Sequence, residues 1–245
     1  MATSMFNLTV NSGVARLTLD RPEARNAIPV SQWRQLGGAA LEAEAAGARV
    51  LVLQSGGTAF CAGADLKDFT AMHRDPASAA EFRRAMRNGI EAIAALAIPT
   101  VALIEGPCFG AGVALAMACY LRFAGPKASF AITPAKFGIS YPQEDVARLV
   151  ALVGPGQASR LLLGAGTIDA TAAIRIGLVE GAIAEAEPFI AAALANSDAS
   201  IASLKRGIAL AAGGSAQDDE QDRTFDALIA GDELAAKLAV LRSKG

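Results

Sequence analysis

The chain has 245 residues, 53% of them hydrophobic and 19% charged, which is enough apolar material for one large core with or without a helical appendage. Its 22 basic and 24 acidic residues give a net charge of −2 and form no basic stripe, so nucleic acid is not expected as a partner. No apolar run approaches the roughly 20 residues that a membrane-spanning helix needs, so no membrane association is expected.

The first part of the chain is predicted to alternate strands with helices, which is typical of the α/β class. Two runs with strand periodicity, Phe6–Val10 and Val14–Leu19, flank Asn11-Ser12-Gly13 and predict a β-hairpin. Further strands are predicted at Arg49–Gln54, Pro99–Ile104, Leu121–Ala124 and Ser129–Ala131, and helices at Val30–Gly47, Ala79–Leu96 and Gly110–Cys119.

After Gly138 the pattern is helical almost to the end of the chain. A repeated strand–strand–helix unit cannot bury its apolar face alone, so the units are expected to stack into a core over residues 1–190. The helices of residues 191–245 carry apolar stripes and are expected to cover that core or a neighbouring subunit. The predicted helices are Glu144–Val153, Gln157–Leu163, Ala170–Gly177, Phe189–Asn196, Ile201–Ala212, Gln217–Ala230 and Asp232–Arg242.

Cysteine and histidine usage points to a reduced compartment without a metal site. Cys61, Cys108 and Cys119 are an odd number without a CxxC motif, so reduced thiols are expected. His73 is the only histidine and lies in a polar stretch, so no metal ligand is predicted there. The opening MATSMFNLTVNSG has neither the basic nor the apolar part of a signal peptide, and the expected location is the cytoplasm.

Two glycine-rich loops are the strongest local signals for chemistry. They are Phe60–Asp65 and Gly106–Gly112, and the second leads directly into a helix. Neither matches a P-loop or a dinucleotide fingerprint, and each can be a closely packed turn only. The alternative is an anion site, because the first N–H groups of a helix have no internal partner and lie at its positive end. The backbone N–H groups of Ala62 and Ala111 would then form an oxyanion hole.

Several motifs in the same order resemble the crotonase superfamily, which is the enoyl-CoA hydratase/isomerase family. The element Arg21–Ala27 (RPEARNA) resembles its RPExRNAL motif, and Phe60–Phe69 (FCAGADLKDF) its first oxyanion loop. Glu105–Gly112 corresponds to its second oxyanion loop and Gly177–Glu180 to its GLV segment. The surroundings of Lys205, Phe225 and Lys237 are similar to its C-terminal helices. The resemblance implies a crotonase-like (ClpP/crotonase) spiral of ββα units with a C-terminal helical region.

The same resemblance implies an acyl-CoA thioester as substrate and an enolate held by the amides of Ala62 and Ala111. No cofactor is expected beyond the coenzyme A that is part of the substrate, and the family's usual assembly implies a homotrimer or homohexamer. Arg25 is a candidate phosphate contact or a solvated surface residue. The coenzyme A moiety is expected to lie along Ala24, Arg25, Ala27, Ala64, Asp65 and Leu66.

Both glutamates that hydratases of this family use as general base and acid are missing. Their positions correspond to Ala114 and Ala135, so hydration by the usual two-carboxylate route is not expected. Some relatives place a carboxylate at the position of Pro142 instead. Glu144 and Asp145 follow it, and they are either tentative catalytic carboxylates or acidic residues of a helix's first turn.

The segment Thr133–Tyr141 resembles the matching segment of methylmalonyl-CoA decarboxylase. That enzyme has a non-glutamate residue after the proline and a tyrosine at the position of Tyr141, although its histidine falls on Ala64. Tyr141 is therefore either a group that orients a departing carboxylate or a partly buried ring with a satisfied hydroxyl.

Three functions are weighed on this basis. The first is an enzyme that forms an acyl-CoA enolate for isomerisation, decarboxylation or an atypical hydration. The second is a non-catalytic acyl-CoA binder, which the loss of both glutamates motivates. RNA binding, known for one relative of the family, is disfavoured by the near-neutral charge.

Overall fold

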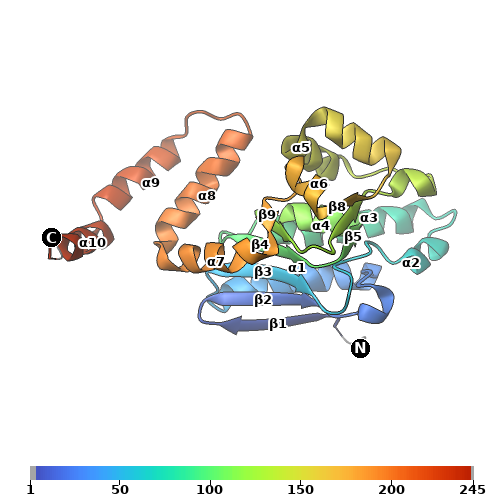
Figure 1. Cartoon of the computed structure of the whole chain (residues 1–245), viewed down its shortest axis with the longest axis horizontal. Helices are drawn as coiled ribbons and strands as arrows, with labels where there is room; N and C mark the ends of the chain where they lie inside the picture. Colours follow the sequence, from blue (N-terminus) through green and yellow to red (C-terminus); the bar gives the residue numbers. More distant parts are fainter. Residues whose placement is uncertain (1–3, 244–245) are drawn as a thin grey trace. The chain divides into compact units, whose positions relative to one another are not determined.

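A computed structural model describes residues 4–243 and divides the chain into two compact units, residues 1–191 and 192–245. The first unit is built on a six-stranded sheet in the order β1-β2-β3-β4-β6-β9 (Figure 1). β1 and β2 form the predicted antiparallel hairpin, and all the other neighbours in this sheet are parallel. The strands are β1 (Phe6–Asn11), β2 (Val14–Leu19), β3 (Val50–Ser55), β4 (Thr100–Ile104), β6 (Leu121–Ala124) and β9 (Gly181–Ala182).

A second, smaller sheet pairs three short strands. β5 (Pro107–Phe109) lies parallel to β7 (Ser129–Ala131), and β7 lies antiparallel to β8 (Ile168–Asp169). The parallel register joins Cys108 to Phe130, and both side chains are buried. The Gly110 turn is therefore built directly on the end of a sheet strand.

Helices cover the sheets of the first unit. α1 (Val30–Ala45) packs against α3 (Pro76–Ala94), where Gly89 lies so close to Trp33 that a Cβ on it would meet the Trp33 carbonyl oxygen at 2.4 Å. The other helices of this unit are α2 (Leu66–Ala71), α4 (Ala111–Ala118), α5 (Gln143–Gly164) and α6 (Ala170–Arg175), and the 3-10 turns are η1 (Pro22–Ala24), η2 (Pro134–Phe137) and η3 (Ile183–Glu185).

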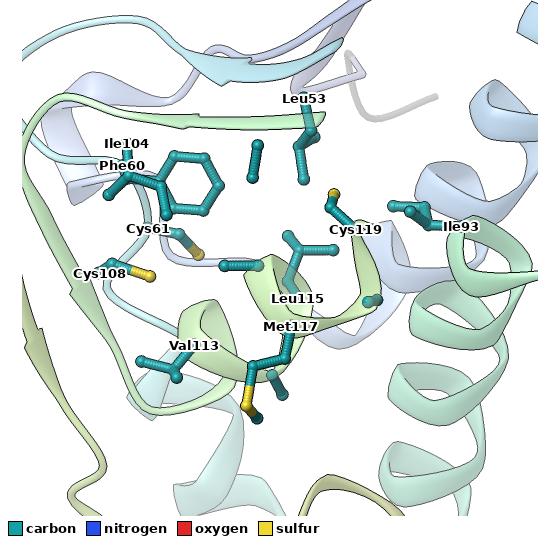
Figure 2. Packing of buried hydrophobic residues seen from close by; sticks show 14 of the residues in the cluster. Leu53, Phe60, Cys61, Ile93, Ile104, Cys108, Val113, Leu115, Met117 and Cys119 are labelled. Atoms are coloured by element: carbon teal, nitrogen blue, oxygen red, sulfur yellow. The ribbon is translucent and has the colours of Figure 1, made fainter. Parts of the chain in front are cut away.

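The central helix α4 lies in the core. Its residues from Gly112 to Ala118 are all buried, as expected for a helix that is apolar on every side. Figure 2 shows Val113, Leu115 and Met117 of this helix among other side chains of the core. The burial fixes where α4 begins and therefore where its first amides point.

The second unit contains α8 (Asp198–Ala212), α9 (Asp219–Ile229) and α10 (Asp232–Arg242), and α7 (Ala186–Ala195) crosses the boundary between the units. α8 packs against α9, where Gln221 donates hydrogen bonds to Ser203, and Ser197 donates to Glu233 of α10. Their side chains line a cavity of about 580 Å³ that Phe225 and Leu228 help to form. No helix in residues 4–243 is long and apolar enough to cross a membrane.

The structure confirms the α/β class, and most predicted elements lie within a few residues of their expected bounds. Seven short elements were not predicted, namely α2, β5, β8, β9 and the 3-10 turns η1, η2 and η3. The two helices predicted on either side of Gly154 are continuous apart from a kink there, where Gly154 adopts φ 73° before Pro155.

Candidate functional site

Three loops gather at one edge of the large sheet. They follow β2, β3 and β4, which end at Leu19, Ser55 and Ile104. We call them the Arg21 loop (residues 21–28), the Cys61 loop (residues 60–66) and the Gly110 loop (residues 106–112). Because the carboxyl ends of parallel strands lie at the same edge of a sheet, these loops occupy the usual ligand position of an open α/β sheet.

Backbone hydrogen bonds join the Cys61 loop to the Arg21 loop. The Ile28 N–H donates to the Gly63 carbonyl at 2.8 Å, and the Asp65 N–H donates to the Ile28 carbonyl at 3.1 Å. The buried Asn26 supports the same junction, because its Nδ2 donates to the Gly56 and Ala59 carbonyls. The two loops therefore form one rigid surface.

The Gly110 loop is tied to the Cys61 loop in the same way. Cys61 and Cys108 form a parallel β-bridge, the Phe60 N–H donates to the Pro107 carbonyl at 3.0 Å, and the Phe109 N–H donates to the Cys61 carbonyl at 2.8 Å. A Cβ added to Gly63 would lie 3.0 Å from the Ala111 nitrogen. The structure thus brings together the two loops that the sequence singled out.

Most amides of these loops already have acceptors within the protein. The Ala62 N–H donates to the Arg25 carbonyl at 2.9 Å, so the donor predicted at this residue is committed elsewhere in the structure. Gly63 N–H points to the Cys61 sulfur at 3.4 Å, and the Gly110 N–H donates to the Ala131 carbonyl. Within residues 4–243 no protein acceptor is found for the half-buried amides of Ala64 and Ala111. These two amides are able to bind a ligand oxygen.

Two glycines give the loops their shape. Gly63 has φ 98°, and Gly110, which precedes α4, has φ 54° and ψ −121°. Side chains disfavour both conformations, so glycine is required for the turns that present the Ala64 and Ala111 amides. Ala111 lies in the first turn of α4, as predicted, and it is the first residue of that helix. Its amide is one of the unpaired donors at the positive end of the helix.

The cysteines beside these loops are inert thiols. Burial raises the pKa of Cys61 to about 12, and the Gly63 N–H only partly offsets this. The pKa of Cys108 is also raised well above its usual value, first by burial and then by the neighbouring Cys61 and Cys119. Neither sulfur is a nucleophile at neutral pH.

The residues predicted to contact coenzyme A line the same edge. Ala24, Ala27 and Ala64 are half-buried, Arg25 is exposed in the left-handed region with φ 52°, and Leu66 is 53% exposed at the start of α2. Asp65 forms an ion pair with Arg21, whose Nη1 lies 2.7 Å from Asp65 Oδ2. Its side chain also caps α2 by accepting a hydrogen bond from the Lys67 N–H. Burial tends to raise the pKa of Asp65, but the hydrogen bonds and charge of Arg21, with the Lys67 amide, lower it overall.

Tyr141 lies directly against the Gly110 loop. Its hydroxyl donates to the Gly110 carbonyl at 3.0 Å, and its ring is half-buried. Burial, first of all, and then the negative charge of the nearby Asp145 raise the pKa of Tyr141 well above its usual value. The hydroxyl is therefore a hydrogen-bond donor throughout the neutral range.

The two candidate carboxylates occupy different environments. Glu144 is in the first turn of α5 and its side chain is 54% exposed, whereas the Asp145 side chain is completely buried. Arg87 Nη1 of α3 donates to Asp145 Oδ1 at 2.9 Å. Burial raises the pKa of Asp145, although the hydrogen bond and charge of Arg87 act against that rise. Sequence reasoning missed Arg87, which lies 58 residues away and belongs to no motif.

The positions of the two missing glutamates have no carboxylate in the structure. Ala114 is fully buried in α4, and Ala135 is exposed in the 3-10 turn η2. Of the two candidate carboxylates, Asp145 is the one whose negative charge acts on the Tyr141 hydroxyl, and that hydroxyl contacts the Gly110 loop.

Comparison with known proteins agrees with this architecture. A family model described as "Enoyl-CoA hydratase/isomerase" matches residues 9–212. A protein named probable enoyl-CoA hydratase echA6 from Mycobacterium tuberculosis is 36% identical over 189 residues, covering 76% of this chain and 75% of the relative. The enoyl-CoA isomerase/hydratase fer4 of Mycosarcoma maydis is 36% identical over 179 residues, covering 69% and 65%.

A solved structure shares the fold over almost the whole chain. A putative enoyl-CoA hydratase/isomerase family protein from Hyphomonas neptunium superposes with a TM-score of 0.92 at 31% identity, covering 99% of this chain and 97% of the other. The crotonase fold predicted from the sequence is thereby confirmed. With the family match spanning most of its length, the chain belongs to the enoyl-CoA hydratase/isomerase family of enzymes.

Proposed function

We propose that this enzyme binds the thioester carbonyl of an acyl-CoA between the amides of Ala64 and Ala111 and stabilises its enolate. The observation that carries the proposal is that these two amides, on adjoining turns, have no acceptor within the described part of the protein. Ala64 takes the place that we predicted for Ala62. Coenzyme A enters as part of the substrate, along Ala24, Arg25, Ala27 and Leu66, and Asp65 contributes by holding the Cys61 loop.

The electrostatics of these loops favour a negative oxygen. Both donors are rigid backbone groups, and Ala111 adds the positive end of α4. Donors that are fixed before the reaction need no reorganisation when charge develops on the carbonyl oxygen, and each one contributes about 3 kcal/mol of barrier lowering.

Isomerisation of a carbon–carbon double bond is the reaction that the remaining groups support best. Hydration needs two carboxylates, and the protein has alanine at both of their positions, Ala114 and Ala135. Isomerisation needs only one group to carry a proton. A base removes the proton from C2 of a 3-enoyl thioester, the electron pair moves to the thioester oxygen, and the same group returns the proton to C4. We assign this transfer to Asp145, whose charge acts on the Tyr141 hydroxyl.

Decarboxylation of a malonyl-type thioester is the second candidate, and the contact between the Tyr141 hydroxyl and the Gly110 loop favours it. The bond from C2 to the carboxylate breaks, carbon dioxide leaves, and the electron pair forms the enolate. A proton from Asp145 or solvent then adds to C2. Here Tyr141 would orient the departing carboxylate.

Hydrogen exchange at C2 tests enolate formation without knowledge of the natural acyl group. Butyryl-CoA is incubated with the enzyme in D₂O, and deuterium uptake is followed by mass spectrometry, alongside turnover of 3-enoyl and malonyl thioesters. Replacing Ala111 by proline removes one donor at a helix position that tolerates proline. We expect exchange to fall by about 10²- to 10³-fold while the fold is kept.

Asp232→Pro is the matched control, because Asp232 also follows a glycine cap at the first position of a helix. It should leave exchange unchanged. Full exchange in Ala111→Pro would overturn the assignment of the oxyanion hole. Acyl-CoA binding by the unmodified protein, without exchange, isomerisation or decarboxylation, would instead establish a non-catalytic binder.

A further inference from the structure

A network of charges surrounds the buried Asp145. Arg87 Nη1 is 2.9 Å from Asp145 Oδ1, and Arg148 Nη1 is 3.7 Å from the same atom. Glu91 joins the two arginines, because its Oε1 is 2.9 Å from Arg87 Nη2 and its Oε2 is 2.6 Å from Arg148 Nη2. Glu144 lies at the edge of the network, 3.9 Å from Arg87 Nη1. The network joins the middle of α3 to the first turns of α5.

One oxygen of this network has no hydrogen-bond partner, although its side chain is buried. Six buried side-chain nitrogen or oxygen atoms in residues 4–243 have no hydrogen-bond partner, and four of them belong to Arg87, Asp145 and Arg148. Two of these four, Arg87 Nη2 and Arg148 Nη1, still take part in the ion pairs with Glu91 and Asp145. Among these four is Asp145 Oδ2, on a side chain with no exposed surface. Buried polar groups are normally satisfied, and a buried ion pair is stable only when its remaining lone pairs are used.

The asymmetry within the carboxyl group is the informative feature. Oδ1 is held by Arg87, whereas Oδ2 is free and belongs to a residue whose charge acts on the Tyr141 hydroxyl. We propose that Arg87 is a positioning residue, which holds Oδ1 so that Oδ2 is the oxygen that accepts and returns the proton. This inference rests on the proposed function, and it adds the residue that fixes the orientation and charge of the proton carrier.

Arg87 also opposes the effect of burial on Asp145. Burial raises the pKa of Asp145, Arg87 and then Arg148 lower it, and Glu144 raises it slightly. Removal of the Arg87 charge must therefore raise this pKa further. A base works only when deprotonated, so the acidic limb of the activity profile must move to higher pH. The titratable and charged groups that face Asp145 come from three segments, namely Arg87 from α3, Glu144 and Arg148 from α5, and Tyr141 from the preceding loop. Glu91 acts on Asp145 through the two arginines. Cys108 faces Tyr141.

The test compares Arg87→Gln with Arg87→Lys, and uses Arg84→Gln, an exposed arginine on the same helix, as the control. The titration of Asp145 is measured directly by NMR on protein labelled with ¹³C at aspartate, with Asp145→Asn to assign the signal. The pH profile of C2 exchange from butyryl-CoA is recorded on the same samples.

For Arg87→Gln we expect a higher pKa of Asp145, a matching shift of the acidic limb, and a kcat about 10²-fold lower with KM nearly unchanged. Arg87→Lys should restore most of the original pKa of Asp145 and most of kcat, and Arg84→Gln should change neither quantity. An unchanged titration, or a shifted titration with an unchanged profile, would overturn the positioning role. Failure of the unmodified protein to exchange any C2 proton would refute the proposed function itself, and the positioning role with it.

Discussion

Gly63 is the residue on which the approach of the Cys61 and Gly110 loops depends. It has φ 98°, and a Cβ at this position would lie 2.8 Å from the Phe109 carbonyl oxygen and 3.0 Å from the Ala111 nitrogen. These neighbours are backbone atoms of a loop that is itself hydrogen-bonded, so they cannot move aside as a flexible side chain would. The close contact therefore requires the absence of a side chain.

Replacing Gly63 by alanine should separate the two loops. We expect a loss of roughly 2–5 kcal/mol in the free energy of unfolding, from the left-handed backbone and the overlap together. C2 exchange should fall further than stability alone explains, because the loops that carry the proposed donors at Ala64 and Ala111 would be moved apart. Urea unfolding and exchange from butyryl-CoA measure the two effects.

Gly38→Ala is the control, because Gly38 is exposed in α1 with no atom within 4 Å of its added Cβ. It should raise the free energy of unfolding by about 0.5–1 kcal/mol and leave exchange unaltered. Equal behaviour of the two variants would show that the approach of the loops is not constrained at Gly63.

At the residue scale, sequence motifs located the loops but not the state of each amide. The glycine spacing was sufficient to predict that Ala111 lies in the first turn of a helix. The motifs predict the donor at the Ala62 amide and place Ala64 only along coenzyme A, whereas in the structure the Ala62 amide donates to the Arg25 carbonyl. Likewise, Arg87 and Asp145 are brought together by the packing of α3 near α5, which no local pattern reports.

At the element scale, length decided only in part what could be predicted, because β6 and β7, with four and three residues, were predicted as strands. Helices such as α1 and α3, and strands of five or six residues, have enough periodicity to be read from the sequence. β5, β8 and β9 have only two or three residues, so they exist because a neighbouring strand pairs with them. Of these three strands β5 matters most for the candidate site, because its pairing with β7 fixes the Gly110 loop.

The pairing of β6 with β9 depends on Arg122, which is 2% exposed. Its Nε donates to the Leu178 carbonyl at 2.9 Å, its Nη1 donates to the Cys119 carbonyl at 2.6 Å, and its Nη2 pairs with Glu180. The backbone N–H of Arg122 also donates to Glu180 Oε2 at 2.6 Å. One guanidinium thus satisfies acceptors from two segments of the chain.

Arg122→Met should cost about 3–5 kcal/mol of stability, because it leaves buried carbonyl oxygens without donors and Glu180 without its partner. Arg175→Met, at an exposed arginine of α6, should stay within about 0.5 kcal/mol of the unmodified protein. Urea unfolding followed by circular dichroism compares them. A loss below about 1 kcal/mol for Arg122→Met would mean that backbone pairing alone holds β9.

At the scale of the whole molecule, the second unit exposes much apolar surface. On α8, Leu204 and Ile208 are 64% and 60% exposed, and on α9, Phe225 and Ile229 are 61% and 55% exposed. Each pair is spaced by four residues and therefore lies on one face of its helix. An exposed apolar patch of this kind marks a surface that another protein surface covers.

We expect copies of this chain to supply that cover, in a homotrimer or homohexamer. Phe225→Glu with Ile229→Glu introduces two charges that would have to be buried at such an interface, and burial of unpaired charge is costly enough to separate the subunits. The mass from light scattering should fall from three or six copies to one. Leu163→Glu, at a residue of the first unit that is 81% exposed, should leave the mass unchanged. An unmodified protein that is already a monomer, or a double variant that keeps the parent mass, would contradict an assembly held together by these helices.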